Sequence, residues 1–427
     1  MELKKYKLGE ILDVTRGASL SGEFYATEGK YIRLTCGNFD YQNNCFKENK
    51  SKDNLYYIGD FKPEFLMEEG DIITPLTEQA IGLLGSTAII LESGKYIQSQ
   101  DVAKIICKEE LLDKDFAFYL ISSTLVKQQL SVAAQQTKIR HTSPDKIRDC
   151  TVWIPELTEQ KRIGKLLRSL DRKIELNRAI NQNLEAMAKQ LYDYWFVQFD
   201  FPNEEGKPYK SSGGEMVWNK KLKREIPKGW NISLIKDIAT TYSGGTPQST
   251  NIEYYNNGEI AWINSGELNS PIITKTTNYI TKCGLENSSA KLYPSNSILV
   301  AMYGATAGKV SLLTFEACSN QAVCGIIPTI ENMLYYVYFH ISSLYSHFIT
   351  LSTGSARDNI SQNTIKNILL PIPTRNILKL FDEKIGSIYQ MIVNNYQQID
   401  SLTKQRDELL PLLMNGQVSV NSDLSAH

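Results

Sequence analysis

Two polar stretches of the chain, residues 135–143 and 352–363, hold the side chains that proteins use to contact nucleic acid. Arginine suits guanine, asparagine and glutamine suit adenine, and serine and threonine suit either base. Ordinary surface loops can have the same composition, but its recurrence in two places favours a DNA-binding surface. The candidate DNA-contacting residues are Lys138, Arg140, His141, Tyr303, Lys309, Arg357, Asn359 and Gln362.

Motifs for catalysis are missing from the sequence. An adenine or cytosine methyltransferase would need a cofactor-binding glycine loop and an Asn/Asp-Pro-Pro-aromatic turn, and neither string occurs. Residues 304–310 resemble a phosphate loop, but three residues instead of four separate Gly304 from Gly308, and Val310 stands where a metal-binding hydroxyl belongs. A turn close to a ligand or to another backbone is the better interpretation. We therefore expect a chain without catalytic residues.

The carboxylates and the metal-binding residue types show no catalytic arrangement either. Glu68, Glu69 and Asp71 could mimic a nuclease cluster, but no Glu-x-Lys pair follows them in a strand, so we interpret them as a solvated turn. The histidines lack metal-site spacing with cysteine, and His340 and His347 fall in an aromatic helix where packing is the simpler role. Seven cysteines without a Cys-x-x-Cys pair favour reduced thiols. The sequence predicts neither a metal site nor a cofactor site.

The composition is that of a globular protein with substantial cores. Of its 427 residues, 42% are hydrophobic and 22% are charged. A net charge of −1 gives no overall attraction to nucleic acid, so DNA binding must be local or shared with a more basic partner. The apolar runs are far shorter than the roughly 20 residues of a membrane span, and no apolar signal region follows the first residues. We expect a cytoplasmic protein that does not contact membranes.

The chain contains an internal repeat. Pro155 and Pro373 lie 218 positions apart, and each follows an isoleucine and precedes a long helical pattern. At the same offset Ser143 corresponds to Ser361. The sequence therefore encodes two copies of one unit, each a globular module followed by a helix.

Each module reads as mixed α/β. In the first, Gly70 opens a turn into a strand that covers residues 72–74, and residues 87–91 form another short β-branched run. Residues 295–300 take the place of the first of these strands in the second module. The segments 98–102 and 319–323 also correspond, so the two modules share one plan and differ in detail.

Each module is followed by a helix with a 3.5-residue apolar repeat. Each helix spans on the order of 39 residues and is therefore roughly 58 Å long, which is more than one small domain can cover. We predict that the two helices pack antiparallel on each other as a coiled coil and hold the modules apart. The predicted seam residues are Leu170, Ile174, Asn177, Leu184, Leu191, Ile388, Ile392, Asn395, Ile399, Leu402 and Leu409.

Two asparagines and two helix-breaking residues predict how these helices pair and where the second one ends. Asn177 and Asn395 occupy equivalent seam positions, where a buried amide fixes the register; an exposed end of the seam is the alternative. Pro411 should kink or end the second helix, and Gly416 should cap it.

The expected organisation follows from these patterns. It comprises a first module at 1–155, a first helix at 156–198, a connector at 199–229, a second module at 230–373, a second helix at 374–416 and a tail at 417–427.

At the level of motifs the chain resembles the DNA-specificity (S) subunits of type I restriction-modification systems, also called the type I restriction S methylase family. The resemblance covers essentially the whole chain. It rests on five segments that are specific only in combination, namely 155–163, 195–202 with the connector after it, 298–310, 319–323 and 353–361.

The resemblance implies a non-catalytic subunit with two target-recognition domains, each of which reads one half of a split, asymmetric sequence in double-stranded DNA. The helices would act as a spacer and dock two modification (methyltransferase) subunits, and motor-nuclease restriction subunits would join for cleavage. S-adenosylmethionine, ATP and Mg²⁺ would belong to those partners. The second copy lacks the pair Glu159 and Gln160 of the first, which predicts different or weaker partner docking at that end.

Other functions remain open from the sequence. A methylation-only system, or an enzyme with fused cutting and modification, could use the same kind of chain. A scaffold protein that oligomerises through its helices predicts no DNA binding even with partners. A nuclease or methyltransferase predicts activity from the isolated chain.

Overall fold

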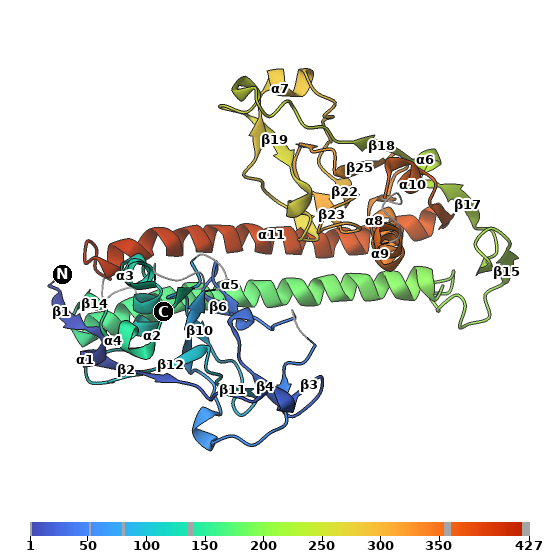
Figure 1. Ribbon diagram of the computed structural model, residues 1–427. Helices are drawn as coiled ribbons and strands as arrows, with labels where there is room; N and C mark the ends of the chain where they lie inside the picture. The colour runs from blue at the N-terminus through green and yellow to red at the C-terminus, as the bar shows by residue number, and fades with distance from the viewer. Residues whose placement is uncertain (1, 51–52, 79–81, 135–139, 354–359, 421–427) are drawn as a thin grey trace. The chain divides into compact units, whose positions relative to one another are not determined.

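The computed structural model describes residues 2–50, 53–78, 82–134, 140–353 and 360–420 (Figure 1). It divides into two compact units, one formed by Met1–Ile174 with Ser401–His427 and the other by Glu175–Asp400. We call them unit 1 and unit 2. Each contains one mixed α/β domain and parts of the two long helices, α5 (Leu157–Tyr192) and α11 (Arg375–Met414). No helix in the described part of the chain is both long and apolar enough to cross a membrane.

The domain of unit 1 is built on two four-stranded sheets, with strand orders β10-β8-β12-β2 and β11-β4-β7-β3. In the first sheet β12 is central, and its Ile105 lies opposite Val14 of β2 and Ile72 of β8. Gly70, at φ +83°, makes the predicted turn into β8. The strands are β2 (Leu12–Arg16), β3 (Tyr25–Ala26), β4 (Tyr31–Arg33), β7 (Tyr56–Tyr57), β8 (Ile72–Pro75), β10 (Ala88–Ile89), β11 (Tyr96–Ile97) and β12 (Val102–Cys107).

Short elements complete this domain. Asp113 caps α2 by accepting a hydrogen bond from the Phe116 backbone, and Phe116 then enters a core that also holds Ile163 of α5 and Leu413 of α11. The remaining elements are β1 (Lys4–Lys7), α1 (Leu8–Ile11), β5 (Phe39–Asp40), β6 (Cys45–Phe46), β9 (Thr77–Glu78), α2 (Lys114–Ile121), α3 (Thr124–Ala134), β13 (Arg140–His141), α4 (Pro144–Arg148) and β14 (Thr151–Ile154).

Unit 2 has a five-stranded sheet in the order β18-β25-β22-β23-β20 and a three-stranded sheet in the order β21-β19-β24. The central β25 again pairs antiparallel with the first long strand, β18, and with β22. Its strands are β17 (Asn231–Leu234), β18 (Ala239–Ser243), β19 (Ile260–Ile263), β20 (Ile272–Ile273), β21 (Tyr279–Ile280), β22 (Ser297–Ala301), β23 (Val310–Leu313), β24 (Cys318–Ser319), β25 (Val323–Pro328) and β26 (Leu369–Ile372). Its helices are α6 (Ile235–Ile238), α7 (Lys282–Glu286), α8 (Leu334–Ser343), α9 (Tyr345–Thr353) and α10 (Gln362–Lys366).

The internal repeat is confirmed by topology. The order β10-β8-β12-β2 in one domain matches β23-β22-β25-β18 in the other, and unit 2 adds an edge strand, β20. In both domains the strand before the long helix pairs with the first strand, because Lys4 lies opposite Ile154 and Asn231 lies opposite Ile372. Two mixed α/β domains and two long helices therefore confirm the predicted α/β (α+β) fold class.

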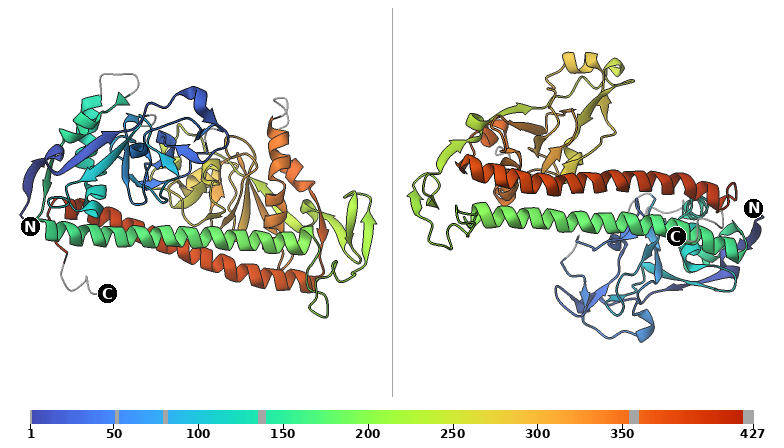
Figure 2. Two further views of the ribbon diagram at one scale, coloured as in Figure 1. Left: turned by 90° about the horizontal axis from the view of Figure 1, so that it is seen from below. Right: turned by 180° about the vertical axis from the view of Figure 1, so that it is seen from behind.

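The two helices lie side by side and antiparallel within unit 2 (Figure 2). Asn181, only 3% exposed, accepts a hydrogen bond from Asn395 Nδ2 at 2.8 Å and donates to the Ile392 carbonyl at 3.3 Å. Asn177 is half-buried and donates to Gln398 Oε1 at 3.1 Å. The buried amide pair is thus Asn181 with Asn395, one helical turn from the predicted Asn177.

Within unit 1 the helix pair is fixed by an ion pair. Arg406 Nη1 lies 2.9 Å from Asp171 Oδ1, both side chains are 11% exposed, and Tyr119 of α2 donates to the other oxygen of Asp171. Burial and the Asp171 carboxylate raise the pKa of Tyr119, so its hydroxyl keeps its proton. A charged pair takes the place of apolar seam residues here.

The predicted seam residues all lie in the helix pair. Leu170, Ile174, Ile392 and Ile399 are buried, and Asn177, Leu184, Leu191, Ile388, Asn395, Leu402 and Leu409 are half-buried. The predicted length is close for both helices, with 36 residues in α5 and 40 in α11.

The end of α11 departs from one expectation and meets another. Pro411 does not end the helix, since α11 continues for three more residues to Met414. Gly416 caps the helix as predicted, with φ at +70° and hydrogen bonds from Gly416 N to Leu413 O and from Gln417 N to Leu412 O.

An aromatic core surrounds the end of α5 in unit 2. The helix widens into a π-helix at Asp193–Val197. Trp195 and Phe196 pack there with Phe381 of α11 and Tyr336 of α8. The connector follows as the hairpin β15 (Met216–Asn219) and β16 (Arg224–Pro227).

The predicted aromatic helix with two histidines is in fact two helices, α8 and α9. His347 of α9 is exposed, whereas His340 of α8 packs against the end of α5. His340 Nε2 lies 3.2 Å from the Leu369 carbonyl, and its Nδ1 lies 3.3 Å from the Tyr192 hydroxyl. Since the carbonyl can only accept, the neutral ring donates through Nε2 and accepts through Nδ1. Burial lowers the pKa of His340 to about 4.

His340 should make the stability of unit 2 depend on pH. Because its pKa is about 4 in the fold and near 6.5 when unfolded, its contribution is complete above pH 6.5 and is lost as the pH falls toward 4, by roughly 3 kcal/mol in all. Urea unfolding at pH 7 and pH 5 measures this loss. The His340→Gln variant should lose less stability than the wild type between these pH values, and His347→Gln should behave as the wild type. Equal losses in all three proteins would contradict the assignment.

Candidate nucleic-acid interface

Two loops cross tightly at one edge of the sheet in unit 1. Gly17 follows β2 so closely beside Gln98 that a Cβ atom on it would lie 2.3 Å from the Gln98 carbonyl oxygen. The Ala18 backbone donates to the same carbonyl at 2.9 Å, and Arg16 Nε donates to the Gln100 carbonyl at 2.8 Å. Only glycine fits at this crossing, so the path of the backbone beside Gln100 is fixed.

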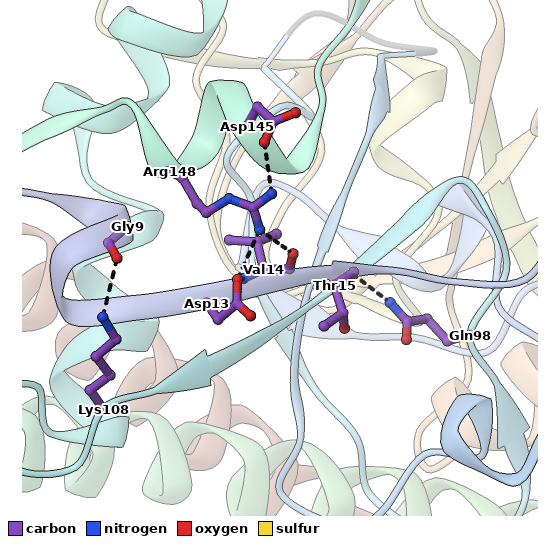
Figure 3. A network of polar contacts seen from close by, with 8 residues as sticks. All are labelled: Gly9, Asp13, Val14, Thr15, Gln98, Lys108, Asp145 and Arg148. Atoms are coloured by element: carbon purple, nitrogen blue, oxygen red, sulfur yellow. Dashed lines mark hydrogen bonds and ion pairs between the residues drawn. The ribbon is translucent and has the colours of Figure 1, made fainter.

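The side chain of Gln98 fixes the same turn from inside. It is 1% exposed, and its Nε2 donates to Thr15 O at 2.8 Å (Figure 3). The same nitrogen donates to Val102 O at 3.1 Å. One amide therefore ties β2 to both sides of the turn 98–102. Gln100 is exposed on that turn.

The same crossing recurs in unit 2. A Cβ atom on Gly244, which follows β18, would lie 2.1 Å from the Asn320 carbonyl oxygen, and Gly245 N donates to Ser319 O at 2.8 Å. Trp262 Nε1 donates to the Gly245 carbonyl at 3.0 Å, which holds the glycine pair from the other side. The two domains thus share this edge down to the backbone contact.

Polar side chains are held in place at the unit 2 edge. Gln321 is exposed at the position that corresponds to Gln100, and Thr246 Oγ1 donates a hydrogen bond to its Oε1. Asn320 Nδ2 donates to Asn264 Oδ1 at 3.2 Å. The Asn320 amide also accepts from Ala322 N at 3.1 Å, so both of its ends are engaged within the domain.

The structure brings two predicted contact residues of unit 1 to this edge. The strand β13 pairs with β9, with Arg140 opposite Glu78 and His141 opposite Thr77. His141 is exposed, and its Nδ1 lies 3.3 Å from Thr77 Oγ1. After β8, Leu76 N donates to Asp101 O at 2.8 Å, which continues the antiparallel register of β8 and β12. The next residue, Thr77, therefore lies opposite Gln100. Thus His141 and Gln100 flank the same residue.

A buried thiol is hydrogen-bonded to the backbone of Thr77. Cys36 Sγ donates to the Thr77 carbonyl at 3.3 Å. Burial raises the pKa of Cys36 to about 11, and the nearby Asp101 carboxylate adds to this effect. The thiol stays protonated and acts as a donor, which agrees with the prediction of reduced core cysteines.

Tyr303 and Lys309 flank the glycine loop of unit 2. Met302 N donates to Ala322 O at 2.7 Å, so the half-buried Tyr303 falls opposite Gln321, as Thr77 does opposite Gln100. Lys309 Nζ donates to Asn269 Oδ1. The loop between them is the predicted tight turn, with both Gly304 and Gly308 at positive φ.

Gln362 uses both ends of its amide inside the protein. Its Nε2 donates to Thr241 O at 2.8 Å, and its Oε1 accepts from Ser243 Oγ at 3.2 Å. These contacts anchor α10 to the end of β18, next to Gly244. The other predicted contact residues, Lys138, Arg357 and Asn359, lie outside the described residues, as do most of the two polar loops.

A polar clamp holds the corresponding helix, α4, in unit 1 (Figure 3). Arg148 donates through Nη1 to Asp13 Oδ1 and to Val14 O, each at 2.8 Å, and through Nη2 to Asp145 Oδ1 at 2.7 Å. Nearby, Lys108 Nζ donates to Gly9 O of α1 at 3.3 Å, which ties the end of β12 to α1. The hydrogen bonds from Arg148 to β2 therefore fix the position of α4, which follows the polar loop.

The predicted acidic turn is only partly solvated. Glu68 N donates to Asp71 Oδ2 at 2.9 Å, which confirms a turn. Asp71, however, is largely buried and pairs with Lys104 at 2.7 Å, so the expectation that it faces solvent is wrong. This pair joins β8 to β12 and leaves no open carboxylate cluster.

Sequence reasoning about the site missed Gln100, Gln321 and Thr246. A signal for the glutamines was present, because both stand at the same place of the corresponding segments 98–102 and 319–323. The role of Thr246 depends on the crossing of two distant loops, which the sequence alone does not reveal.

Comparison with known families identifies the chain. The type I restriction modification DNA specificity domain matches residues 1–186 and 227–409, most of the sequence. The chain belongs to this family. Two similar relatives are specificity subunits of type I restriction enzymes. MjaIX of Methanocaldococcus jannaschii is 25% identical over 325 residues, which cover 75% of this chain and 73% of the relative. HindI of Haemophilus influenzae is 25% identical over 375 residues, 76% and 81% of the two chains.

A solved structure supports the fold of this family member. The crystal structure of the type I restriction-modification S subunit from M. genitalium covers 97% of this chain and 96% of its own, with a TM-score of 0.61 and 15% identity. At that identity the likeness shows a shared fold.

The pair Glu159 and Gln160 has an internal role in this specificity-domain protein. Gln160 is 1% exposed, donates to Pro155 O and Leu111 O, and accepts from Asp113 N at 3.0 Å. Glu159 is 7% exposed and accepts from Val420 N at 3.0 Å. At the equivalent positions of the second copy, Ile377 and Leu378 are 8% and 2% exposed, and α11 begins at the residue that corresponds to the start of α5. The change in partner docking stays a prediction.

The glycine crossing should be intolerant of a side chain. Gly244→Ala would force the backbone apart at Asn320, and we expect it to destabilise unit 2 by about 1–3 kcal/mol. Gly266→Ala is the matched control, because a Cβ atom there meets nothing within 4 Å. Urea unfolding of both variants measures the difference. Equal midpoints would show that the crossing is not a tight constraint.

Proposed function

We propose that this chain is the DNA-specificity subunit of a type I restriction-modification complex, in which 1–155 and 230–373 each form a target-recognition domain. The recurrence of one polar, glycine-packed edge in two domains of the same topology carries the proposal. Each domain reads one half of a split target. Because the side chains at the two edges differ, the two half-sites differ and the target is asymmetric.

Reading through a major groove requires the exposed polar groups that these edges present. Two half-sites read on one face of the duplex lie about one helical turn apart, roughly 34 Å from centre to centre. The helices at 156–198 and 374–416 act as the spacer, and 199–229 serves as the connector. Buried polar contacts within the helix pair support this role, since a spacer must keep one register.

The chemistry belongs to partners in this proposal. The chain itself is not catalytic, and two modification subunits supply S-adenosylmethionine and adenine methylation in the cytoplasm. Motor-nuclease restriction subunits, with ATP and Mg²⁺, join for cleavage.

An apolar stripe on α5 supports the docking of a modification subunit. Leu176, Ile180, Met187 and Tyr194 are 59%, 38%, 56% and 37% exposed. At 100° per residue the first three, which lie in α5, fall on one face of the helix, beside the seam that α11 covers. Tyr194 follows in the π-helical turn. An exposed apolar row on a long helix favours a partner helix that packs along it.

The stripe leads into a groove within unit 2. The groove has a volume of about 720 Å³ and is lined by Leu191, Tyr194 and Trp195 of the α5 segment, Pro202 and Pro208 of the connector, and Ile388 of α11. Lys384 and Asp200 also line it. Such a groove suits an apolar anchor with a polar rim.

Co-expression tests the function. The chain should be produced with the modification subunit encoded beside it in a host free of adenine methylation, and the genomic DNA sequenced for methylated adenines. A split motif that appears only with both chains is expected. A co-purifying complex without modification would contradict the reading role, and failure to co-purify would favour the scaffold alternative. Methylation by the chain alone would favour a catalytic role.

Charges on the stripe should block docking. We expect the double variant Ile180→Glu and Met187→Glu to lose co-purification of the modification subunit by at least tenfold, with no fall in the thermal midpoint because both side chains are exposed. The matched control, Ala179→Glu with Ala186→Glu, adds the same charges on another exposed face of α5. Pull-down from the co-expressing host measures both. Equal losses would place the docking surface elsewhere or indicate a general charge effect.

A further inference from the structure

The two exposed glutamines occupy one position of the repeated fold. Gln100 lies opposite Thr77, and Gln321 lies opposite Tyr303, across the same pair of strands in each domain. The residues before Gln100 pack against Gly17, in the loop after β2, and the residues before Gln321 pack against Gly244, in the loop after β18. A matched pair of side chains on two matched, rigid turns indicates one shared task.

The surroundings of each glutamine are polar and belong to the candidate interface. Arg16 donates a hydrogen bond to the carbonyl of Gln100. His141 contacts Thr77, the residue opposite Gln100. Next to Gln321, Thr246 holds its side chain, and Tyr303 stands opposite. The edge therefore combines a fixed backbone with exposed side chains, as the direct reading of bases requires.

We propose that Gln100 and Gln321 are specificity-determining residues, each of which reads one adenine in the half-site bound by its own domain. This inference rests on the proposed function. A glutamine amide matches the major-groove edge of adenine, because its Nε2 donates to N7 while its Oε1 accepts from the N6 amino group.

Thr246 is a positioning residue for this contact. Its hydroxyl donates to one lone pair of Gln321 Oε1 and leaves the second lone pair for the adenine amino group. In unit 1 the carbonyl of Gln100 is held instead, by Arg16, so the side chain of Gln100 is less constrained.

Competing candidates fit less well. Gln362 has both ends of its amide engaged by β18, and Gln98 is buried. Lys309 carries a point charge that suits a phosphate, and a phosphate contact carries no sequence information. Gln100 and Gln321 combine exposure, rigid support and equivalence between the two domains.

The test uses the complete complex with its modification subunits. Gln321→Ala should relax the methylated motif at a single A·T pair of one half-site, and Gln100→Ala at a single A·T pair of the other. Competition binding compares the target duplex with a duplex substituted at that base pair, and the preference for the target should fall on the order of ten- to a hundredfold in the variant. A substitution at any other base pair should change the affinity of the wild type and of the variant by the same factor. Each variant is the control for the other half-site.

Thr246→Val supplies a second variant of similar volume. It should weaken discrimination at the same base pair as Gln321→Ala, by a smaller factor, and should add little in the double variant. Losses at different base pairs, or losses that multiply, would remove Thr246 from the contact.

The outcomes separate this inference from the proposed function. A wild-type complex that yields no split motif contradicts the function itself. A wild-type motif that stays unchanged in Gln321→Ala and Gln100→Ala overturns the assignment of the glutamines alone. Uniform weakening at every base of a half-site, with an unchanged thermal midpoint, would mark a phosphate contact and overturn base reading as well.

Discussion

The structure depends on polar contacts buried in the pairing of α5 with α11. A seam of leucine and isoleucine alone could slide by one heptad at little cost, since every apolar position would find another. Asn181 with Asn395 in unit 2, and Asp171 with Arg406 in unit 1, remove that freedom because a shifted pairing would leave buried polar groups without partners. Each domain core includes residues of these helices, so each domain packs on its own segment of the pair.

The edge that forms the candidate interface is built on a different principle from the cores. At the crossings of Gly17 and Gly244 the backbone itself is packed, and glycine is needed because another backbone occupies the place of a side chain. Hydrogen bonds from Gln98 and Trp262 complete this support from the inside. Rigid backbone beneath exposed amides allows an edge to be polar and still well ordered.

Much of this architecture follows from the sequence, since heptad spacing and the 218-residue repeat predict two helices and two like domains. What periodicity cannot reveal is which seam asparagine finds a partner: Asn181, rather than Asn177, faces Asn395, because pairing depends on the stagger of two distant segments. Pro411 shows a second limit, as a proline near a helix end is tolerated when the last turn continues into a glycine cap. At the candidate site the sequence indicated His141 and Tyr303 but not Thr246, whose partner is 75 positions away.

The crossings have an evolutionary consequence. Gln100 and Gln321 are displayed by turns whose shape is set by glycines and buried partners, and not by the displayed residue. Replacement of an exposed side chain on such a turn costs little stability. Selection can therefore try new residues at these positions, and new sequence preferences with them, without first repairing the fold. The same frame could diversify quickly among related strains while its cores and its helix pair stay constant.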